Sequence, residues 1–294
     1  MPERGEVRTG GKEGSMTEQE RAAGAVGRLA AKALLYEVCA APKPGLVDRF
    51  NSGAHRDMDI FTFVDSALAL EPYFARCALA GHEAGRADGA LLAVLRPLGL
   101  AAEETMLRAT GGVNTHKGAI FSLGLLCAAV GCCGCGDAET LCRAAGDIAA
   151  PVLDDYRRAD FAARTAGERF YASAGVLGVR GEAAAGFPSV RRIALPQLER
   201  ALADGRSIND ACVLALLALI ASVDATTMRK RGGARVDALH DEARALLADW
   251  SAERTAALDA RWSRLGVSAG GCADLLGAAL LLHFLPGAGI CFDG

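Results

Sequence analysis

The spacing of apolar residues is the feature that most constrains the fold of this chain. Apolar residues recur three and four positions apart through most of the sequence, and the strict alternation typical of half-buried strands is almost absent. Hydrophobic residues make up 51% of the 294 residues, while aromatic residues make up only 5%. Ala and Leu lead the apolar fraction and favour helices over sheets. We therefore expect an all-α fold, a single large multi-helix domain with no sheet.

The expected helices occupy the segments with this periodicity: 17–40, 59–85, 87–96, 101–109, 115–133, 137–157, 160–173, 189–203, 207–223, 236–264 and 271–285. Three of them begin with capping signals. Thr17-x-x-Glu20 predicts a capping box, Asp137 predicts an N-cap, and Ser207-x-x-Asp210 resembles a capping box with Asp in place of Glu. Pro151 predicts a kink within 137–157.

The first fifteen residues are polar and Gly-rich and contain no apolar core of a signal peptide. We expect 1–15 to be a disordered leader and 16–294 to form the single domain. Three later stretches, 118–135, 211–223 and 275–285, are apolar enough to raise the question of a membrane. The last two are too short to span one and the first is interrupted by glycines, so we expect buried core helices.

Charge and cysteine usage exclude further classes of protein. The formal net charge of −3 gives no basic field for nucleic acid. Ten cysteines without a secretory signal indicate a reducing cytoplasm rather than a disulfide framework. Cys132, Cys133 and Cys135 contain one Cys-x-x-Cys pair, which zinc could use, but no second pair exists, so small residues at a helix end are the preferred interpretation.

The most informative connection is Asn114-Thr115-His116-Lys117-Gly118, which opens a long apolar helix. The free N–H groups and the positive dipole of a helix start attract anions, Lys117 adds a charge, and Gly118 leaves room for a phosphate. An ordinary capped helix start with a solvated lysine is the alternative. No P-loop, dinucleotide-binding turn or Gly-x-Ser-x-Gly nucleophile elbow is present in the sequence.

Two carboxylates in His55-Arg56-Asp57-Met58-Asp59 stand at the start of the next helix. They suit either helix capping or a shared Mg²⁺, since Mg²⁺ takes one or two carboxylates together with substrate phosphates.

Other connections between the expected helices also contain charged residues. Pro42-Lys43-Pro44-Gly45 predicts a stiff turn that presents Lys43 and Arg49, or simply a rigid connector. Arg231-Gly232-Gly233 predicts a basic loop, and Asp274 in the first turn of the last apolar helix either matches the helix dipole or faces a site.

Taken together, these stretches resemble the triphosphoribosyl-dephospho-CoA synthase family. The matching runs are Lys43-Pro44-Gly45-Leu46-Val47-Asp48-Arg49, Gly53-Ala54-His55-Arg56-Asp57-Met58-Asp59, Gly112-Val113-Asn114-Thr115-His116-Lys117-Gly118, Arg180-Gly181-Glu182-Ala183 with Gly186-Phe187-Pro188, Arg231-Gly232-Gly233 and Gly270-Gly271-Cys272-Ala273-Asp274. The chain departs from the family pattern at Ala269, where a Pro often stands, and at Ala225, where an Asn follows the Asp.

The resemblance implies an all-α enzyme that uses Mg²⁺-ATP. It transfers the triphosphoribosyl unit to the ribose 2′-hydroxyl of 3′-dephospho-CoA, releases adenine, and passes the product to a separate transferase that loads an acyl carrier subunit of citrate lyase. On these grounds the candidate catalytic residues are Asp57, Asp59, His116 and Lys117, with Asp57 and Asp59 also as metal ligands. The candidate substrate-binding residues are Lys43, Arg49, His55, Asn114, Thr115, Gly118, Arg180, Glu182, Arg231, Gly232, Gly233 and Asp274.

Three other functions compete with this one. The paralogous enzyme of malonate decarboxylase performs the same reaction, although Val47-Asp48-Arg49 is closer to the citrate lyase type. A hydrolase would cleave the N-glycosidic bond of a nucleotide with water as acceptor. A non-catalytic helical adaptor would not need paired carboxylates and basic Gly-rich loops. The sequence leaves the catalytic base and the oligomeric state, including a homo-oligomer, open.

Overall fold

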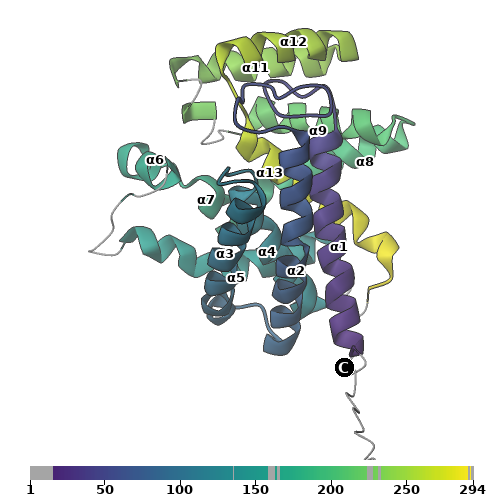
Figure 1. Cartoon of the computed structure of the whole chain (residues 1–294), viewed down its shortest axis with the longest axis vertical. Coiled ribbons are helices and arrows are strands. Elements are labelled where there is room, and N and C mark those ends of the chain that lie inside the picture. The colour runs from purple at the N-terminus through teal and green to yellow at the C-terminus, as the bar shows by residue number, and fades with distance from the viewer. Residues whose placement is uncertain are drawn as a thin grey trace, which may run out of the picture.

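The computed structural model describes residues 16–134, 136–157, 163, 166–223, 228–230, 233–290 and 292. These residues form helices and connections without a strand, as Figure 1 shows, so the expected all-α class is confirmed. The expectations for 1–15 and for Cys135 lie outside the described residues. The helices are α1 Glu18–Cys39, α2 Ile60–Ala84, α3 Gly89–Ala109, α4 Lys117–Cys133, α5 Ala138–Ala149, α6 Ala166–Ala174, α7 Gly178–Ala184, α8 Leu195–Ala203, α9 Ile208–Ser222, α11 Val236–Ala248, α12 Ala252–Leu265 and α13 Gly270–Phe284.

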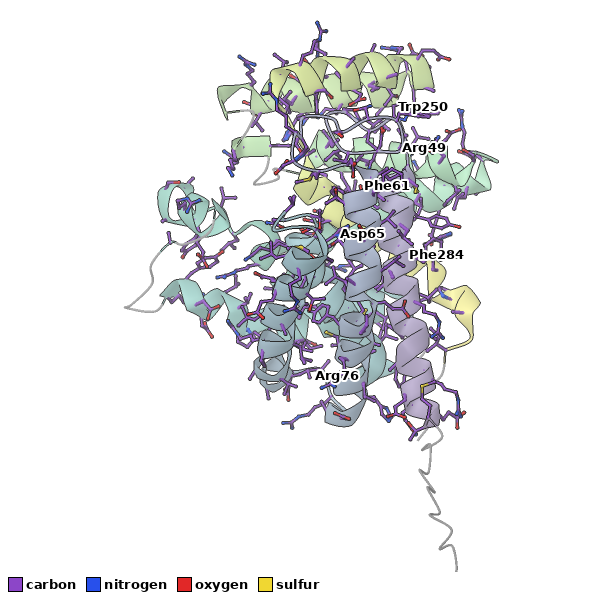
Figure 2. The ribbon with its side chains drawn as sticks, in the orientation of Figure 1. Arg49, Phe61, Asp65, Arg76, Trp250 and Phe284 are labelled. Atoms are coloured by element: carbon purple, nitrogen blue, oxygen red, sulfur yellow. The ribbon has the colours of Figure 1, made fainter. Side chains whose placement is uncertain are left out.

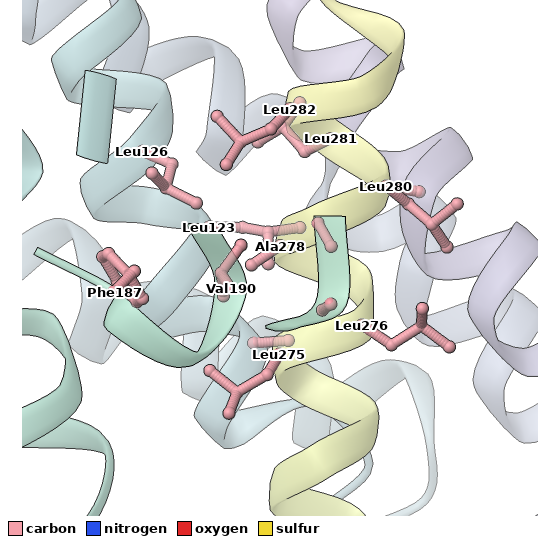
Figure 3. Close-up of a cluster of buried hydrophobic side chains, with 14 of the residues drawn as sticks. Leu123, Leu126, Phe187, Val190, Leu275, Leu276, Ala278, Leu280, Leu281 and Leu282 are labelled. Carbon is pink, nitrogen blue, oxygen red and sulfur yellow. The ribbon is translucent and has the colours of Figure 1, made fainter. Parts of the chain in front are cut away.

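Three apolar helices, α4, α9 and α13, form the centre of the molecule. Helix α13 packs against α1, α4, α8 and α9, and Figure 3 shows its Leu275 and Ala278 near Leu123 of α4 and Val190. Most residues of these helices are buried, which confirms the expectation for the three apolar stretches. Within the described residues no single helix is both long and apolar enough to cross a membrane, and the bent pair 117–133 and 138–157 passes only by length and composition.

Small residues let α2 and α4 approach each other closely. A Cβ atom at Gly81 would collide with the backbone of Ala128, and one at Gly131 would collide with the backbone of Ala78. Glycine is therefore required at both positions, because even one methyl group would separate the two backbones. This contact fixes the register of α4, whose first turn contributes to the site described below.

The three predicted N-cap residues, Thr17, Asp137 and Ser207, all cap their helices. Thr17 and Glu20 form both bonds of a capping box, and the Asp137 side chain accepts the backbone N–H of Thr140. Ser207 accepts the backbone N–H of Asp210, but the Asp210 carboxylate accepts an N–H of the Asn209 side chain and does not complete a box. The predicted interruption at Pro151 is also confirmed, because the chain changes there from α5 to a 3₁₀ helix, Ala150–Arg157.

Three predicted boundaries are wrong. The segments 87–96 and 101–109 form one helix, α3, that continues through Pro97. Pro97 is exposed, so water can satisfy the carbonyl that its missing N–H leaves free. The segment 236–264 is two helices, α11 and α12, because Ser251 begins a new helix by accepting the N–H of Arg254.

The third error concerns residues 178–184, which form helix α7 where a connection was expected. The expected helix at 160–173 is seen as α6 over Ala166–Ala174, and most of 158–165 lies outside the described residues.

The connection between α1 and α2, residues 40–59, is held against the C-terminal half of the chain. The Asp259 carboxylate accepts the N–H of Gly45 and an N–H of the Asn51 side chain, at 2.9 Å each. Gly45 has a φ of 68° and packs against the carbonyl of Val267, which leaves no room for a Cβ. Figure 2 shows Arg49 of this connection between Trp250 and Phe61. The connection is therefore a fixed part of the fold.

Candidate active site

A cleft of about 740 Å³ opens between the N-terminal turn of α4, helices α3, α6 and α7, and the start of α13. Its wall carries eight charged side chains, four acidic and four basic: Glu103, Glu168, Glu182 and Asp274, with Lys117, Arg169, Arg180 and Lys230. The remaining lining includes Asn114, Gly118, Phe121 and Tyr156. A cleft of this size, with charged groups on a largely apolar wall, is typical of a small-molecule site.

Lys117 and Arg180 are the predicted basic residues that the structure places on this wall. The Lys117 ammonium pairs with the Glu103 carboxylate at 2.5 Å. The Arg180 guanidinium donates to Glu168 at 2.9 Å and lies 5.1 Å from the centre of the Tyr156 ring. Both cations are held in place by these acids, and a bound polyanion would have to compete with the acids for them.

Asp274 stands near the start of α13, and its side chain lies against the first turn of α4 on the cleft wall. Its carboxylate occupies the space that a Cβ on Gly118 would need, and the N–H of Ala119 stabilises the charged form. Burial, helped by the charge of Glu37, raises the pKa of Asp274 to about 8. No ion pair joins Asp274 to a cation among the described residues. Within that part of the chain, it is the one acid of the four on this wall that neither forms a salt bridge nor hydrogen-bonds to another side chain.

Two of the backbone N–H groups that were predicted to bind an anion at the start of α4 are therefore already hydrogen-bonded to side chains of the protein. The Asn114 side chain accepts the N–H of Lys117 at 3.2 Å, and Asp274 is the partner of the Ala119 N–H. His116, the N-cap, makes no side-chain capping bond.

Behind this turn lies a chain of buried polar groups. The His116 ring nitrogen Nδ1 lies 2.7 Å from the Ser66 hydroxyl, which also accepts the hydroxyl of Thr115 at 2.8 Å. Burial lowers the pKa of His116 to about 3, and the nearby Lys43 charge acts in the same direction. His116 is thus neutral at pH 7 and cannot act as a cation toward phosphate. Its Nε2 is buried and has no hydrogen-bond partner among the residues that the structure describes.

Lys43 does not project from its turn as predicted. It is 1% exposed and pairs with the Glu37 carboxylate, and it also donates to the Glu37 carbonyl at 2.7 Å. The prediction that the turn presents Lys43 is wrong because the aliphatic stem and the charge both find partners inside the fold. Arg49 donates to the Cys39 carbonyl at 2.7 Å and to the Asn209 side chain at 2.8 Å, away from the residues that line the cleft.

The predicted acidic pair, Asp57 and Asp59, stands at the start of α2 and is not among the residues that line the cleft. Asp59 is the N-cap of α2 and accepts both the N–H and the hydroxyl of Thr62, which lowers its pKa. The Asp57 carboxylate is 66% exposed and lies 3.9 Å from Nδ1 of His55, whose Nε2 is 3.1 Å from the Ser268 hydroxyl. Capping, one of the two functions considered for this pair, is confirmed for Asp59.

Of the remaining predicted residues, one lines the cleft, one lies elsewhere in the described structure, and two lie outside the described residues. Glu182 lies on the cleft wall, accepts the N–H and the hydroxyl of Ser189, and has a pKa raised by burial. Gly233 begins a short 3₁₀ helix, Gly233–Arg235, with a φ of 55°. Arg231, Gly232 and Ala225 lie outside the described residues.

The cleft thus gathers six predicted residues: Asn114, Lys117, Gly118, Arg180, Glu182 and Asp274. It does not gather Lys43, Arg49, His55, Asp57 or Asp59 among its lining. Residues that the sequence reasoning missed on the same wall include Glu103, Tyr156, Glu168, Arg169 and Lys230. Lys230 directly precedes the predicted basic run at Arg231, and Glu103, Glu168 and Arg169 are polar residues of predicted helices, a weaker signal that does not single them out.

Comparison with known proteins now decides the family. Residues 23–290 match the CitG family, described as ATP:dephospho-CoA triphosphoribosyl transferase. This chain belongs to that family. A protein of Vibrio cholerae serotype O1 (strain M66-2), "Probable 2-(5''-triphosphoribosyl)-3'-dephosphocoenzyme-A synthase", is 40% identical over 274 residues, which cover 88% of each chain.

Two further relatives agree. The 2-(5''-triphosphoribosyl)-3'-dephosphocoenzyme-A synthase of Pectobacterium atrosepticum is 41% identical over 265 residues, or 87% of each chain. A probable enzyme of the same name from Lactiplantibacillus plantarum is 42% identical over 228 residues, which cover 73% of this chain and 78% of the relative. No solved structure matches this chain.

A magnesium site was tested against the donor groups present. No group of three or more His, Cys, Asp or Glu side chains within the described ranges could hold a metal ion. The two capping bonds of Asp59 use only its Oδ1 oxygen, and the Asp57 carboxylate takes no part in capping. That pair suffices for Mg²⁺ that arrives with the phosphates of ATP, because the nucleotide and water supply the other ligands.

Proposed function

We propose that this chain transfers the 5-triphosphoribosyl group of ATP to the ribose 2′-hydroxyl of 3′-dephospho-CoA and releases adenine. The family match over residues 23–290 carries this proposal. The cleft supports it, because four cations and a raised-pKa carboxyl stand together on one wall. Such a wall suits an anionic substrate and a proton transfer.

The reaction moves one proton and exchanges one bond at C1′ of the ATP ribose. The acceptor 2′-hydroxyl loses its proton, its oxygen bonds to C1′, and the bond from C1′ to adenine breaks with the electron pair leaving on adenine. Adenine then takes up a proton. A carboxylate can accept the first proton and return it as the second, as carboxyl groups do in glycoside hydrolysis.

Asp274 is our candidate for that carboxyl group. It lies on the cleft wall, it has no cation partner among the described residues, and its pKa of about 8 lies close to neutral pH, where a general base works best. Glu103 and Glu168 hold Lys117 and Arg180, and Glu182 holds Ser189, so these three are less suited to the role.

Lys117 and Arg180 are the candidates for binding the triphosphate. Both project into the cleft and both already pair with a carboxylate, which a triphosphate can replace with a stronger charge. His116, together with Ser66 and Thr115, is a positioning group for this turn, because it is buried and uncharged at neutral pH.

Magnesium enters this proposal with ATP. When bound, it neutralises phosphate charge and orients the triphosphate. Asp57 and Asp59, which are not among the residues that line the cleft, are the residues that would hold it.

The biological setting remains a proposal as well. The product would be the precursor of the citrate lyase prosthetic group, and a separate transferase would load it onto an acyl carrier subunit. Both substrates are found in the cytoplasm, where we place the reaction. The same reaction in the service of malonate decarboxylase is the alternative setting.

Incubation with Mg²⁺-ATP, with and without 3′-dephospho-CoA, tests the reaction. Chromatography should detect adenine only when both substrates are present, together with an equal amount of a product that joins the two nucleotides. Adenine release at the same rate without dephospho-CoA would show the hydrolase instead. ADP or AMP as the main product would reject glycosyl transfer altogether.

A further inference from the structure

A second pocket of about 230 Å³ adjoins the cleft and is predominantly aliphatic. The two spaces share three wall residues, Glu103, Phe121 and Arg180. Leu92 and Leu95 of α3 and Val152 of the 3₁₀ helix line the rest, together with residues of α2 and α4. The predicted site residues did not point to this side pocket, apart from Arg180 at its edge.

Polar groups of the side pocket lie at its edge or are already in use. The Tyr73 hydroxyl donates to the Ile120 carbonyl at 3.1 Å. Arg96 pairs with Asp155 at 2.9 Å, and Arg180 and Glu103 belong to the wall shared with the cleft. The leucine and valine surfaces offer no hydrogen bond to a ligand.

The lack of free polar groups inside the side pocket decides which of the two substrates suits it. Adenine carries ring nitrogens and an amino group, each of which needs a partner when buried. The mercaptoethylamine end of a pantetheine arm carries two methylene groups and a thiol, which is only a weak hydrogen-bond donor. An aliphatic pocket therefore suits the thiol end of the arm better than the adenine ring.

We propose that the side pocket receives the thiol end of the pantetheine arm of dephospho-CoA and so selects the acceptor substrate. This inference rests on the proposed function for the identity of the acceptor. The arm would pass from the charged cleft, beside Glu103 and Arg180, into the aliphatic space. Arg180, the candidate above for binding the triphosphate of ATP, lines both spaces and would therefore also lie beside the arm of the acceptor.

Gly99 provides a way to fill this pocket without disturbing the fold. It lines the pocket from α3, and a Cβ there would have its nearest neighbour, the Tyr73 hydroxyl, at 3.7 Å, an ordinary contact. Replacing a helical glycine also favours the helix. Gly99→Leu should fill the space, and Gly99→Ala should leave most of it open. Gly24→Leu in α1 is the matched control, because Gly24 is in a helix away from both spaces and meets only the flexible Arg28 side chain.

The first measurement is the affinity for dephospho-CoA, by calorimetry without ATP. Loss of the buried methylene groups and sulfur should weaken binding roughly ten- to fifty-fold in Gly99→Leu, and by less than threefold in Gly99→Ala and Gly24→Leu. The methyl ester of ADP, which has the adenosine and diphosphate without the arm, should bind wild type and Gly99→Leu equally. This measurement does not depend on turnover, so it separates failure of the inference from failure of the proposed reaction.

The second measurement is steady-state kinetics of adenine release. In Gly99→Leu the KM for dephospho-CoA should rise by the same factor, and the KM for ATP should stay within twofold of wild type. A rise in the KM for ATP instead would place adenine in the side pocket and overturn the proposal. Unchanged affinity for dephospho-CoA in a folded Gly99→Leu protein would also overturn it.

Discussion

At the scale of single residues, Asp274 carries a cost in stability that its place on the cleft explains. Burial beside Glu37 favours the neutral acid, and the partly compensating Ala119 N–H does not restore the ordinary pKa. Because the folded pKa of about 8 is above the ordinary value of 3.8, the folded chain holds a proton that the unfolded chain releases. The stabilising effect of that proton is present below pH 4 and is lost as the pH rises toward 8.

Asp274→Asn should therefore separate activity from stability. We expect kcat/KM to fall roughly 10²- to 10⁴-fold, the usual range for loss of a general base. The Tm should rise at pH 8 relative to wild type, and the difference should shrink as the pH approaches 4. Thermal scans across this range, with Asp88→Asn in an exposed N-cap as control, check the result. A variant with near-normal turnover would exclude Asp274 as the base.

Lys117→Ala tests whether Lys117 binds the triphosphate of ATP. The variant removes a charge-assisted hydrogen bond worth about 1.5–3 kcal/mol, which corresponds to roughly ten- to a hundred-fold in the KM for ATP or in kcat. The KM for dephospho-CoA should change much less. Glu103→Gln, which frees Lys117 from its partner without removing the cation, is the companion variant. Unchanged ATP kinetics in Lys117→Ala would assign the triphosphate to other cations of the cleft, such as Arg180.

At the scale of elements, two helix starts with the same capping chemistry allow the magnesium proposal to be tested. Asp59 caps α2 and Asp137 caps α5, each by accepting the N–H of a threonine three residues later. Asn caps a helix about as well as Asp, so Asp59→Asn and Asp137→Asn should both keep their helices. Only Asp59→Asn should lose the Mg²⁺-dependent part of the reaction rate.

The readout is the Mg²⁺ concentration needed for half-maximal rate. We expect it to rise at least tenfold in Asp59→Asn and in Asp57→Asn, and to stay unchanged in Asp137→Asn. If all three variants titrate like wild type, the acidic pair at the start of α2 is a helix cap alone, and Mg²⁺ enters with ATP without these ligands.

The contact between α2 and α4 gives a prediction about packing. Gly81→Ala places a methyl group against the backbone of Ala128, where neither helix can yield without moving the other. We expect a loss of about 1–3 kcal/mol in the free energy of unfolding, the usual cost of overpacking. Gly24→Ala is the control, because its added methyl meets only a flexible arginine, and it should be neutral or stabilising. Denaturant titration measures both, and equal stability of Gly81→Ala and wild type would contradict the close approach.

Helix boundaries were predictable from the sequence where the residues of a single turn fix them, and less so where packing against distant residues determines them. The caps at Thr17, Asp137 and Ser207 are local chemistry, and the structure confirms all three. The stretch between 96 and 101 was expected to separate two helices, but Pro97 in it is exposed and α3 continues through it. Whether a proline interrupts a helix depends on which side of the helix is exposed, and that depends on neighbours distant in sequence.

At the scale of the whole molecule, the fold class and part of the cleft were predictable, while the partners of the charges were not. Lys43 was expected at the surface, and only the path of the chain brings it against Glu37 in the interior. Asp274 and Gly118 are far apart in sequence, and their contact depends on how α13 crosses α4. A single sequence records which residues can carry charge, but the packing of helices selects which of them meet.

The central place of α13 has a consequence for synthesis of the chain. Residues 270–284 leave the ribosome after α1, α4 and α9, yet they fill the space between these helices. Until then the faces of α4 and α9 that pack against α13 lack that partner, and Asp274 is absent from the cleft. The nascent chain must therefore carry exposed apolar surface for most of its synthesis, a state in which chains are prone to aggregate or to need chaperones. The residue that completes the charged wall of the cleft arrives with the helix that closes the core.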